Sequence, residues 1–298
     1  MFECFLEYLK KTECVFTEYT DLSSASSIKI GAVARAVIYP DKTEKLIDVL
    51  KVIKKISLPY IVLGNMSNIL FKDEIYNGVV VKTQKIKRKY LAEDKIKLEC
   101  GCTLPAMARQ ISEYDLGGFE GLLGIPGTVG GMIRQNAGAF GYEISDRCIS
   151  CSVYDTERDE VLEISRENMG FGYRTSMLND KRFILLSASL APIPKPRAHI
   201  IEEFNAYVAL RRQAQPTNRP SLGSVFKRVN GIGAGYYIDK LGLKGFLVGG
   251  AQVSTKHAGF IVNTGFATAK DVLALIDIIK SRAYNELGIA LEEEIEII

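Results

Sequence analysis

The sequence predicts an α+β fold in three successive parts: a small β-α-β part, a part made mainly of antiparallel strands, and a C-terminal α+β part. Helical and strand-like apolar periods alternate in the first part, whereas strand-like alternation dominates the second. The segment Pro192-Ile193-Pro194-Lys195-Pro196 is expected to continue neither a strand nor a helix, and it is the clearest boundary in the chain. We therefore expect domains at residues 1–83, 84–195 and 196–298.

The first part is expected to open with a helix, followed by a strand at 34–40 and a helix at 43–56. A buried strand at 59–63 then leads into a polar glycine turn, and the strand resumes at 69–71. The turn is Gly64-Asn65-Met66-Ser67-Asn68. Strand, glycine turn and strand together make a short motif that could hold a ligand.

The second and third parts contain fewer but clearer helices. We expect one helix at 104–114 and another at 199–212. The strongest helix signal begins at Thr268, which caps it with Asp271 three positions later, and it ends at Gly288. The final residues, 291–298, alternate as a strand whose even-numbered glutamates would share a solvated face.

A long glycine loop at 124–141 is the most informative segment of the chain. It holds six of the 26 glycines, together with one proline and few charges. Apolar residues are interspersed with the glycines, as in a backbone that is packed on one side and bare on the other, whereas a flexible linker would be rich in serine. Bare amides in such a loop form a site for phosphate. Tight turns at sheet corners are the alternative interpretation.

Neither glycine segment has the spacing of a nucleotide-hydrolysing P-loop or of a Rossmann fingerprint that opens a helix. A dinucleotide held by two separate loops remains compatible with the pattern.

Composition limits the possible functions. The 298 residues are 47% hydrophobic and 24% charged, with a formal net charge of +3, which is too small to indicate a nucleic-acid partner. The basic run at 82–89 (KTQKIKRK) is interpreted as a solvated loop. We find no secretory signal and no stretch long enough to span a membrane, so we expect a cytoplasmic protein without membrane contact.

Six cysteines include a C-x-C pair, Cys100 and Cys102, and a C-x-x-C pair, Cys148 and Cys151. With only two histidines in the chain, a metal site is not favoured. We interpret the cysteines as reduced core residues and expect no metal.

These segments occur with further motifs, in an order that closely resembles the UDP-N-acetylenolpyruvoylglucosamine reductase family. The resemblance covers nearly the whole chain, and its motifs, occurring together in this order, are highly specific although each alone is weak. The two glycine segments match the family's G-x-G-S-N turn and its G-I-P-G-x-x-G-G and N-A-G-A-[YF]-G loop. The later matches are Tyr173-Arg174-Thr175-Ser176, Gln215-Pro216, Gly223-Ser224-Val225-Phe226-Lys227, Ala234-Gly235, Gly242-Leu243-Lys244-Gly245, Lys256-His257 and residues 291–295.

The resemblance implies a flavoenzyme of peptidoglycan precursor synthesis. NADPH would reduce a tightly bound FAD, leave, and be replaced by the enolpyruvyl ether of UDP-N-acetylglucosamine, which is reduced to UDP-N-acetylmuramate. The chain lacks an insertion for the tyrosine-bearing loop of some members, so it resembles the compact subtype. We expect a monomer that works on these small molecules.

The resemblance also assigns the site residues. Catalysis would use Arg174 to hold the substrate carboxylate, Ser224 to donate a proton to the enolate-like intermediate, and Glu294 either to complete the charged shell or to supply a proton. Tyr173 and Lys227 would join Arg174 in binding substrate. FAD would be held by Gly64, Asn65, Met66, Ser67, Asn68, Gly127, Thr128, Gly130, Gly131, Asn136, Ala137 and Gly138.

Three positions depart from the family pattern. Asn65-Met66 replaces glycines, Arg228-Val229 replaces Asn-Pro, and Gly259 stands where asparagine is usual. Two other functions are therefore considered. A flavin oxidase would typically attach its flavin through a histidine near the first turn, but no histidine precedes His199. A catalytically silent relative that binds flavin or a UDP-sugar as a sensor is the second alternative.

Overall fold

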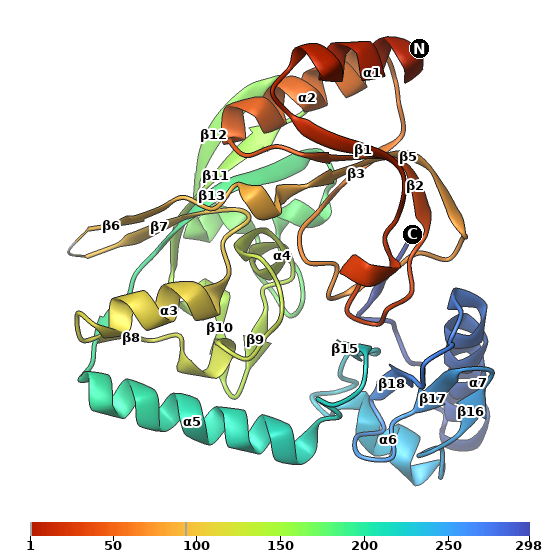
Figure 1. Cartoon of the computed structure of the whole chain (residues 1–298). Helices are drawn as coiled ribbons and strands as arrows, with labels where there is room; N and C mark the ends of the chain where they lie inside the picture. Colours follow the sequence, from red (N-terminus) through yellow and green to blue (C-terminus); the bar gives the residue numbers. More distant parts are fainter. Residues whose placement is uncertain (1, 93) are drawn as a thin grey trace. The chain divides into compact units, whose positions relative to one another are not determined.

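The computed structural model describes residues 2–92 and 94–298, and its mixture of helices and sheets confirms the predicted α+β class (Figure 1). The α-helices of the described residues are α1 (Phe2–Lys11), α2 (Thr43–Lys55), α3 (Leu104–Ser112), α4 (Val129–Arg134), α5 (Arg197–Ala214), α6 (Ala234–Lys240) and α7 (Ala269–Leu287).

The strands of the first half are β1 (Val15–Asp21), β2 (Val33–Tyr39), β3 (Tyr60–Leu63), β4 (Ile69–Leu70), β5 (Ile75–Lys82), β6 (Lys89–Leu91), β7 (Ile96–Glu99), β8 (Leu116–Gly117), β9 (Gly138–Ala139) and β10 (Tyr142–Glu143). Those of the second half are β11 (Cys148–Asp155), β12 (Glu160–Ser165), β13 (Phe183–Leu190), β14 (Ile193–Pro194), β15 (Ser221–Ser224), β16 (Leu247–Val248), β17 (Ala251–Val253), β18 (Phe260–Asn263) and β19 (Glu296–Ile297).

The chain divides into two compact units, each described by itself below. The first unit contains residues 1–19, 35–65 and 77–209, and the second contains residues 20–34, 66–76 and 210–298. The first glycine turn is thus shared, because Gly64 and Asn65 belong to the first unit and Met66 to Asn68 to the second. The three-part division at 1–83, 84–195 and 196–298 stays a prediction.

One sheet, in the order β1-β2-β5-β3, lies below α1 and α2 in Figure 1. The helices are amphipathic and bury leucines such as Leu9 and Leu46 in the same core as Val79 and Val81 of β5. Strands β3 and β5 are parallel, with Leu63 opposite Lys82 at their carboxyl ends. This pairing brings the glycine turn that follows β3 beside the end of β5.

The second sheet of the first unit is antiparallel throughout, in the order β12-β11-β13-β7-β6. It confirms the expectation of antiparallel strands after residue 84. The prediction that 192–196 continues no strand is wrong for Ile193 and Pro194, which pair with β8. Proline is tolerated there because this two-stranded pairing leaves its missing N–H without consequence at an edge.

The second unit holds the sheet β15-β18-β17-β16 together with α6 and α7. The predicted start and end of α7 are confirmed: Thr268 and Asp271 form a capping box, and Gly288 ends the helix in a left-handed conformation. The expected terminal strand at 291–298 is wrong in length. Only Glu296 and Ile297 form a strand, β19, which pairs in parallel with β4.

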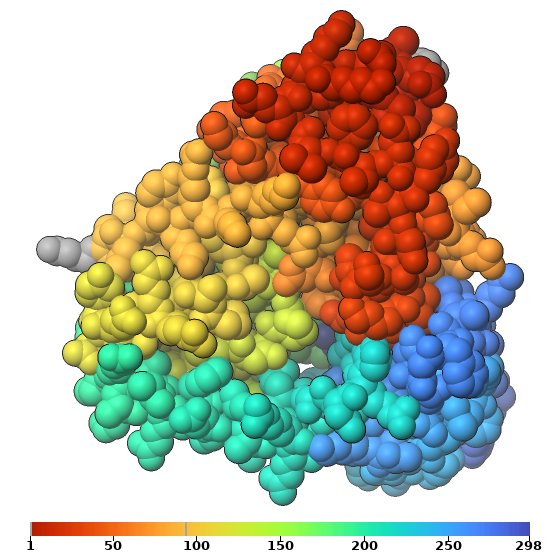
Figure 2. Space-filling view, in the orientation of Figure 1, coloured from red at the N-terminus to blue at the C-terminus, as the bar shows by residue number. Residues whose placement is uncertain are grey.

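Helix α5 confirms the helix expected at 199–212 and extends it at both ends. Ile200 is its only fully buried residue among those described, and the residues coloured teal lie exposed on the face drawn in Figure 2. The helix is therefore a surface element and not a core one.

Candidate active site

The two glycine segments meet at Gly64 and Thr128, both in the first unit. A Cβ atom added to Gly64 would lie 2.2 Å from the Thr128 hydroxyl oxygen, well inside van der Waals contact. Thr128 is the N-cap of α4, where its hydroxyl accepts a hydrogen bond from the Gly131 N–H at 3.5 Å. Position 64 therefore requires glycine as long as Thr128 keeps this place.

Backbone donors gather at this meeting point. Four N–H groups make no hydrogen bond to any described residue, namely those of Gly64, Asn65, Gly127 and Thr128. Gly131 is exposed, and a Cβ added to it would contact only the Thr128 hydroxyl, at 4.0 Å. Gly130 instead packs inward, where its N–H donates to the Cys100 carbonyl at 2.9 Å. The two glycine segments thus offer unused backbone donors, as an anion site does.

The buried side chain of Asn136 hydrogen-bonds within the protein. It is 1% exposed, with a left-handed φ of 37°, and its side-chain N–H₂ donates to Glu143 at 2.9 Å and to the Gly172 carbonyl at 3.0 Å. Its side-chain oxygen accepts from the Ser145 N–H at 3.2 Å. The adjacent Ala137 N–H donates to the Met132 carbonyl at 2.8 Å. These groups are already used within the protein, so both residues serve first to fix the loop.

Arg174 lies on a two-residue turn closed by backbone hydrogen bonds between Gly172 and Thr175. Its φ of 53° is left-handed, and its guanidinium donates to the Gly138 carbonyl at 3.0 Å and to the Asn136 carbonyl at 3.5 Å. The same group lies 5.1 Å from the centre of the Tyr173 ring, which is 43% exposed. The residue assigned to the substrate carboxylate thus lies in direct contact with the loop assigned to FAD.

In the second unit, the segment that carries Ser224 runs beside the one that carries Glu294. The Glu294 N–H donates to the Val225 carbonyl at 2.7 Å, and Phe226 pairs with Glu293. The half-buried Ser224 hydroxyl donates to the Phe226 carbonyl at 3.1 Å. Two of the three catalytic candidates therefore lie on hydrogen-bonded neighbours.

Asn68 secures the Glu294 segment in the same unit. Its side-chain N–H₂ donates to the Glu294 carbonyl at 2.9 Å, and its own carbonyl accepts from the Glu296 N–H at 2.9 Å. The side-chain amide is therefore engaged with protein, and its assignment as a cofactor ligand stays a prediction.

Lys227 follows Ser224 by three residues and is about one-third exposed. Its ammonium pairs with the exposed carboxylate of Glu292, and its N–H donates to the Glu292 carbonyl at 2.9 Å. Val229 pairs with Ile232 across Asn230-Gly231, whose φ values of 51° and 80° suit a tight hairpin turn. The departure at Arg228-Val229 thus leads into a tight hairpin turn.

Met66 explains the departure in the first turn. It is 3% exposed and has a φ of 54°, so a methionine adopts the left-handed backbone that glycine favours. Asn65 accepts a hydrogen bond from Gln84 at 2.9 Å through its side-chain oxygen. The left-handed conformation at position 66 is therefore formed here by a residue other than glycine.

The interpretation of the basic run at 82–89 as a solvated loop is wrong at Lys82, Thr83 and Ile86, which are buried. Lys82 is 1% exposed, and its ammonium donates to the Gly64 carbonyl. Burial lowers the pKa of Lys82 to about 8. The many basic residues of the run favoured a solvated position for Lys82. The three preceding valines, Val79 to Val81, were a signal that Lys82 ends a buried strand.

The described residues contain no cluster of three or more His, Cys, Asp or Glu side chains that could hold a metal ion. Burial raises the pKa of Cys100 to about 12 and that of Cys102 to about 11. Cys148 and Cys151 lie with their sulfur atoms 3.7 Å apart inside the protein. The Cys100 and Cys102 thiols are therefore protonated at neutral pH and poor metal ligands.

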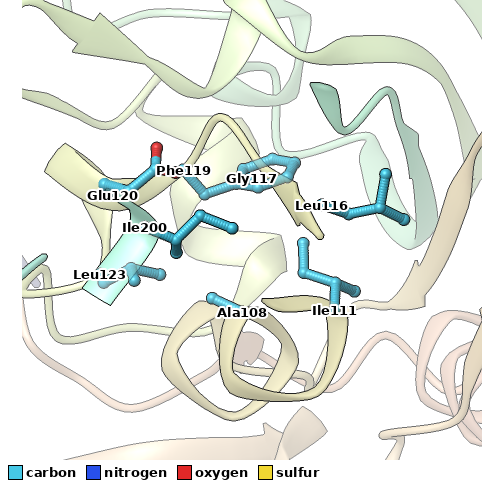
Figure 3. A pocket seen from close by; sticks show the side chains of 8 residues that line it. All are labelled: Ala108, Ile111, Leu116, Gly117, Phe119, Glu120, Leu123 and Ile200. Carbon is cyan, nitrogen blue, oxygen red and sulfur yellow. The ribbon is translucent and has the colours of Figure 1, made fainter. Parts of the chain in front are cut away.

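A small apolar pocket lies between α3, β8 and α5 (Figure 3). It is too small to hold a water molecule and is lined by Ala108, Ile111, Leu116, Gly117, Phe119, Glu120, Leu123 and Ile200. None of these is a predicted site residue, so the pocket is a packing gap.

Comparisons with known proteins decide the family. Residues 34–165 match an FAD binding domain, and residues 215–298 match the UDP-N-acetylenolpyruvoylglucosamine reductase C-terminal domain. The chain is 41% identical to the UDP-N-acetylenolpyruvoylglucosamine reductase of Caldicellulosiruptor bescii, over 98% of this chain and 93% of the relative. It is 41% identical to that of Clostridioides difficile, over 91% and 90%. This chain belongs to the UDP-N-acetylenolpyruvoylglucosamine reductase family.

A solved structure agrees. The crystal structure of UDP-N-acetylenolpyruvylglucosamine reductase from Thermus caldophilus superposes with a TM-score of 0.79 at 33% identity, covering 96% of this chain and 98% of the other. As a member of this reductase family the protein is an FAD-dependent oxidoreductase of peptidoglycan precursor synthesis, and its cofactor is FAD. Among the described residues, no helix has the length and apolar character needed to cross a bilayer.

The residues present fit this cofactor. FAD carries a diphosphate, and the first unit offers four unused N–H donors and an open Gly131 within the matched FAD-binding region. Gly64 leaves no room for a side chain against Thr128, which keeps backbone at the surface of the turn. The chemistry of the donors therefore suits a dinucleotide anion.

Proposed function

We propose that this chain reduces the enolpyruvyl ether of UDP-N-acetylglucosamine to UDP-N-acetylmuramate with electrons from NADPH. A hydride adds to the terminal vinyl carbon and a proton adds to the carbon beside the carboxylate, while NADPH becomes NADP⁺. The observation that best supports the proposal is the backbone pairing of Val225 and Phe226 with Glu293 and Glu294, which keeps Ser224 and Glu294 on neighbouring segments.

FAD would be held by the unused amides of Gly64, Asn65, Gly127 and Thr128, with Met66, Ser67, Gly131 and Gly138 beside them in the same two segments. When bound, FAD supplies hydride transfer between the two substrates, which bind in turn.

Arg174 is proposed to bind the substrate carboxylate. A guanidinium keeps its charge at all working pH values and presents a planar fork to a carboxylate. Hydrogen bonds to the Asn136 and Gly138 carbonyls hold the guanidinium against the glycine loop. The same positive charge would stabilise the negative charge that develops next to the carboxylate during hydride addition.

Ser224 is proposed as the proton donor. A serine hydroxyl is a very weak acid, but a carbanion-like enolate is basic enough to take its proton when the geometry is fixed. The hydroxyl donates to the Phe226 carbonyl at 3.1 Å, which is long for an O–H donor. Rotating the hydroxyl toward substrate therefore breaks only a weak hydrogen bond. Glu294 would add charge or a second proton source beside it, and Tyr173 and Lys227 would contact the substrate.

The test separates the two half-reactions. In Ser224→Ala we expect NADPH to bleach the flavin at the wild-type rate, while anaerobic reoxidation by the enolpyruvyl substrate slows by at least a thousandfold, because the proton donor is lost. Stopped-flow absorbance near the flavin band measures both steps.

Ser221→Ala, on the same strand β15, is the matched control and should behave as wild type in both steps. Equal loss in both half-reactions of Ser224→Ala would refute the role of Ser224. A wild-type protein that is bleached by NADPH but never reoxidised by this substrate would instead identify a silent flavin-binding relative.

A further inference from the structure

Lys82 is a buried cation whose place follows from the strand pairing. It is the last residue of β5 and lies opposite Leu63, the last residue of β3, at the carboxyl ends of a parallel pair (Figure 1). Its side chain is directed to the residue after Leu63, since the ammonium donates to the Gly64 carbonyl. In parallel sheets, ligands bind beyond these carboxyl ends.

The ammonium of Lys82 is not neutralised within the protein. An ammonium has three donors, and among the described residues it makes one hydrogen bond and no ion pair. Burial is the sole cause of its lowered pKa, and no acidic side chain offsets it. Because a buried charge is costly unless it is paired, a lysine at this position points to an anion supplied from outside the chain.

Uncharged donors surround the same turn. The N–H groups of Gly64 and Asn65, together with those of Gly127 and Thr128, have no acceptor among the described residues. A carboxylate would be satisfied by two or three of these donors, whereas the cation and four amides together suit a group with more oxygens and two charges.

We propose that Lys82 is the counter-cation of the FAD diphosphate. The assignment rests on the proposed placement of FAD at the two glycine segments, and it adds a cationic side chain that reaches the Gly64 turn from strand β5. The amides would position the diphosphate, and Lys82 would neutralise it from the protein side of the Gly64 turn.

The first experiment compares ligands that share or lack the diphosphate. Apoprotein of wild type, Lys82→Met and Lys87→Met is titrated with FAD, ADP and riboflavin by calorimetry. Lys87 is exposed and belongs to the same basic run, so its variant controls for net charge. We expect Lys82→Met to weaken FAD and ADP by at least twentyfold and to leave riboflavin unchanged, and Lys87→Met to match wild type throughout.

The second measurement, of melting temperature, distinguishes an electrostatic role of Lys82 from a structural one. Methionine has the length of the lysine stem without the charge, so apo Lys82→Met should melt at the same temperature as apo wild type or higher. The increase in melting temperature caused by saturating FAD should be smaller than in wild type. A lower apo melting temperature, with all three ligands weakened equally, would show a structural role and overturn the proposal.

The outcomes also separate this proposal from the function. If wild type binds FAD and Lys82→Met binds FAD and ADP as tightly, the role of Lys82 is refuted and the reductase activity is untouched. If wild type binds neither FAD nor ADP, the cofactor site itself is misplaced, and the assignment of Lys82 falls with it.

Discussion

The glycine segments of the first unit and the Ser224–Glu294 region of the second unit use backbone and side chains in opposite ways. At Gly64, Asn65, Gly127 and Thr128 the backbone N–H groups are unused, while the polar side chains of Asn136 and Lys82 are buried and hydrogen-bonded. In the second unit the backbone of Val225 and Glu294 is paired, whereas Ser224 and Lys227 remain partly exposed. The first arrangement suits the binding of an anionic ligand, and the second suits the side-chain chemistry proposed for Ser224.

The largest loss of stability is expected on replacing Asn136, whose buried side chain belongs to the first unit. Asn136→Ala removes three side-chain hydrogen bonds and leaves alanine at a left-handed φ of 37°, so we expect a loss of about 4 kcal/mol in the free energy of unfolding. Urea unfolding of the apoprotein measures it.

Asn179, which is exposed and hydrogen-bonds only to Thr175 among the described side chains, provides the control. Asn179→Ala should lose less than about 0.5 kcal/mol. If Asn136→Ala lost no more than this, the loop would not depend on its buried amide. The structural role of buried polar side chains in the first unit would then be contradicted.

A smaller effect is expected from the titration of Lys82. Its pKa of about 8 lies below its ordinary value of 10.5, so between these pH values the unfolded chain binds the proton more tightly than the folded one. The penalty is fully present below pH 8 and disappears as the pH rises toward 10.5. At 1.36 kcal/mol per pKa unit, the free energy of unfolding of apo wild type should rise across this window by on the order of 3 kcal/mol relative to Lys82→Met.

Urea unfolding at a series of pH values, with the two proteins side by side, removes contributions from other groups that titrate in the same range. Parallel curves for wild type and Lys82→Met would mean that the lysine is not desolvated in the folded apoprotein.

The smallest effect is expected at Asn68 in the second unit, where a single side-chain hydrogen bond reaches the Glu294 carbonyl. Asn68→Ala should cost about 1 kcal/mol of stability and slow flavin reoxidation by substrate about threefold, with FAD affinity unchanged. Calorimetry and stopped-flow absorbance test this. A large loss of FAD affinity would instead show that the Asn68 side chain is a cofactor ligand, so that residues of the second unit would also bind FAD.

Much of the fold could be predicted because its signals are local. Helix α7 was delimited by Thr268, Asp271 and Gly288, each of which acts within one helical turn of its own position. The terminal strand was predicted too long because alternation at 291–298 does not reveal how far the neighbouring backbone continues beside it. Only Glu296 and Ile297 form a regular strand against β4.

The candidate site was predictable to the extent that its motifs mark special backbone. Glycine at position 64 has a steric reason in Thr128, and the Arg174 turn follows its motif. Lys82 was missed because a lysine in a basic run is usually solvated, and only the parallel pairing of β3 and β5 buries it beside Gly64. That burial depends on residues nearly twenty positions apart, which local pattern cannot show.

The uncompensated ammonium of Lys82 bears on the lifetime of the protein in the cell. A chain without FAD carries a buried charge and four unused amides, so it opens more readily than the loaded chain and is more often exposed to proteases. Newly made chains that fail to acquire the cofactor would then be degraded first. Flavin supply would thereby set how much of the protein accumulates, as well as how active it is.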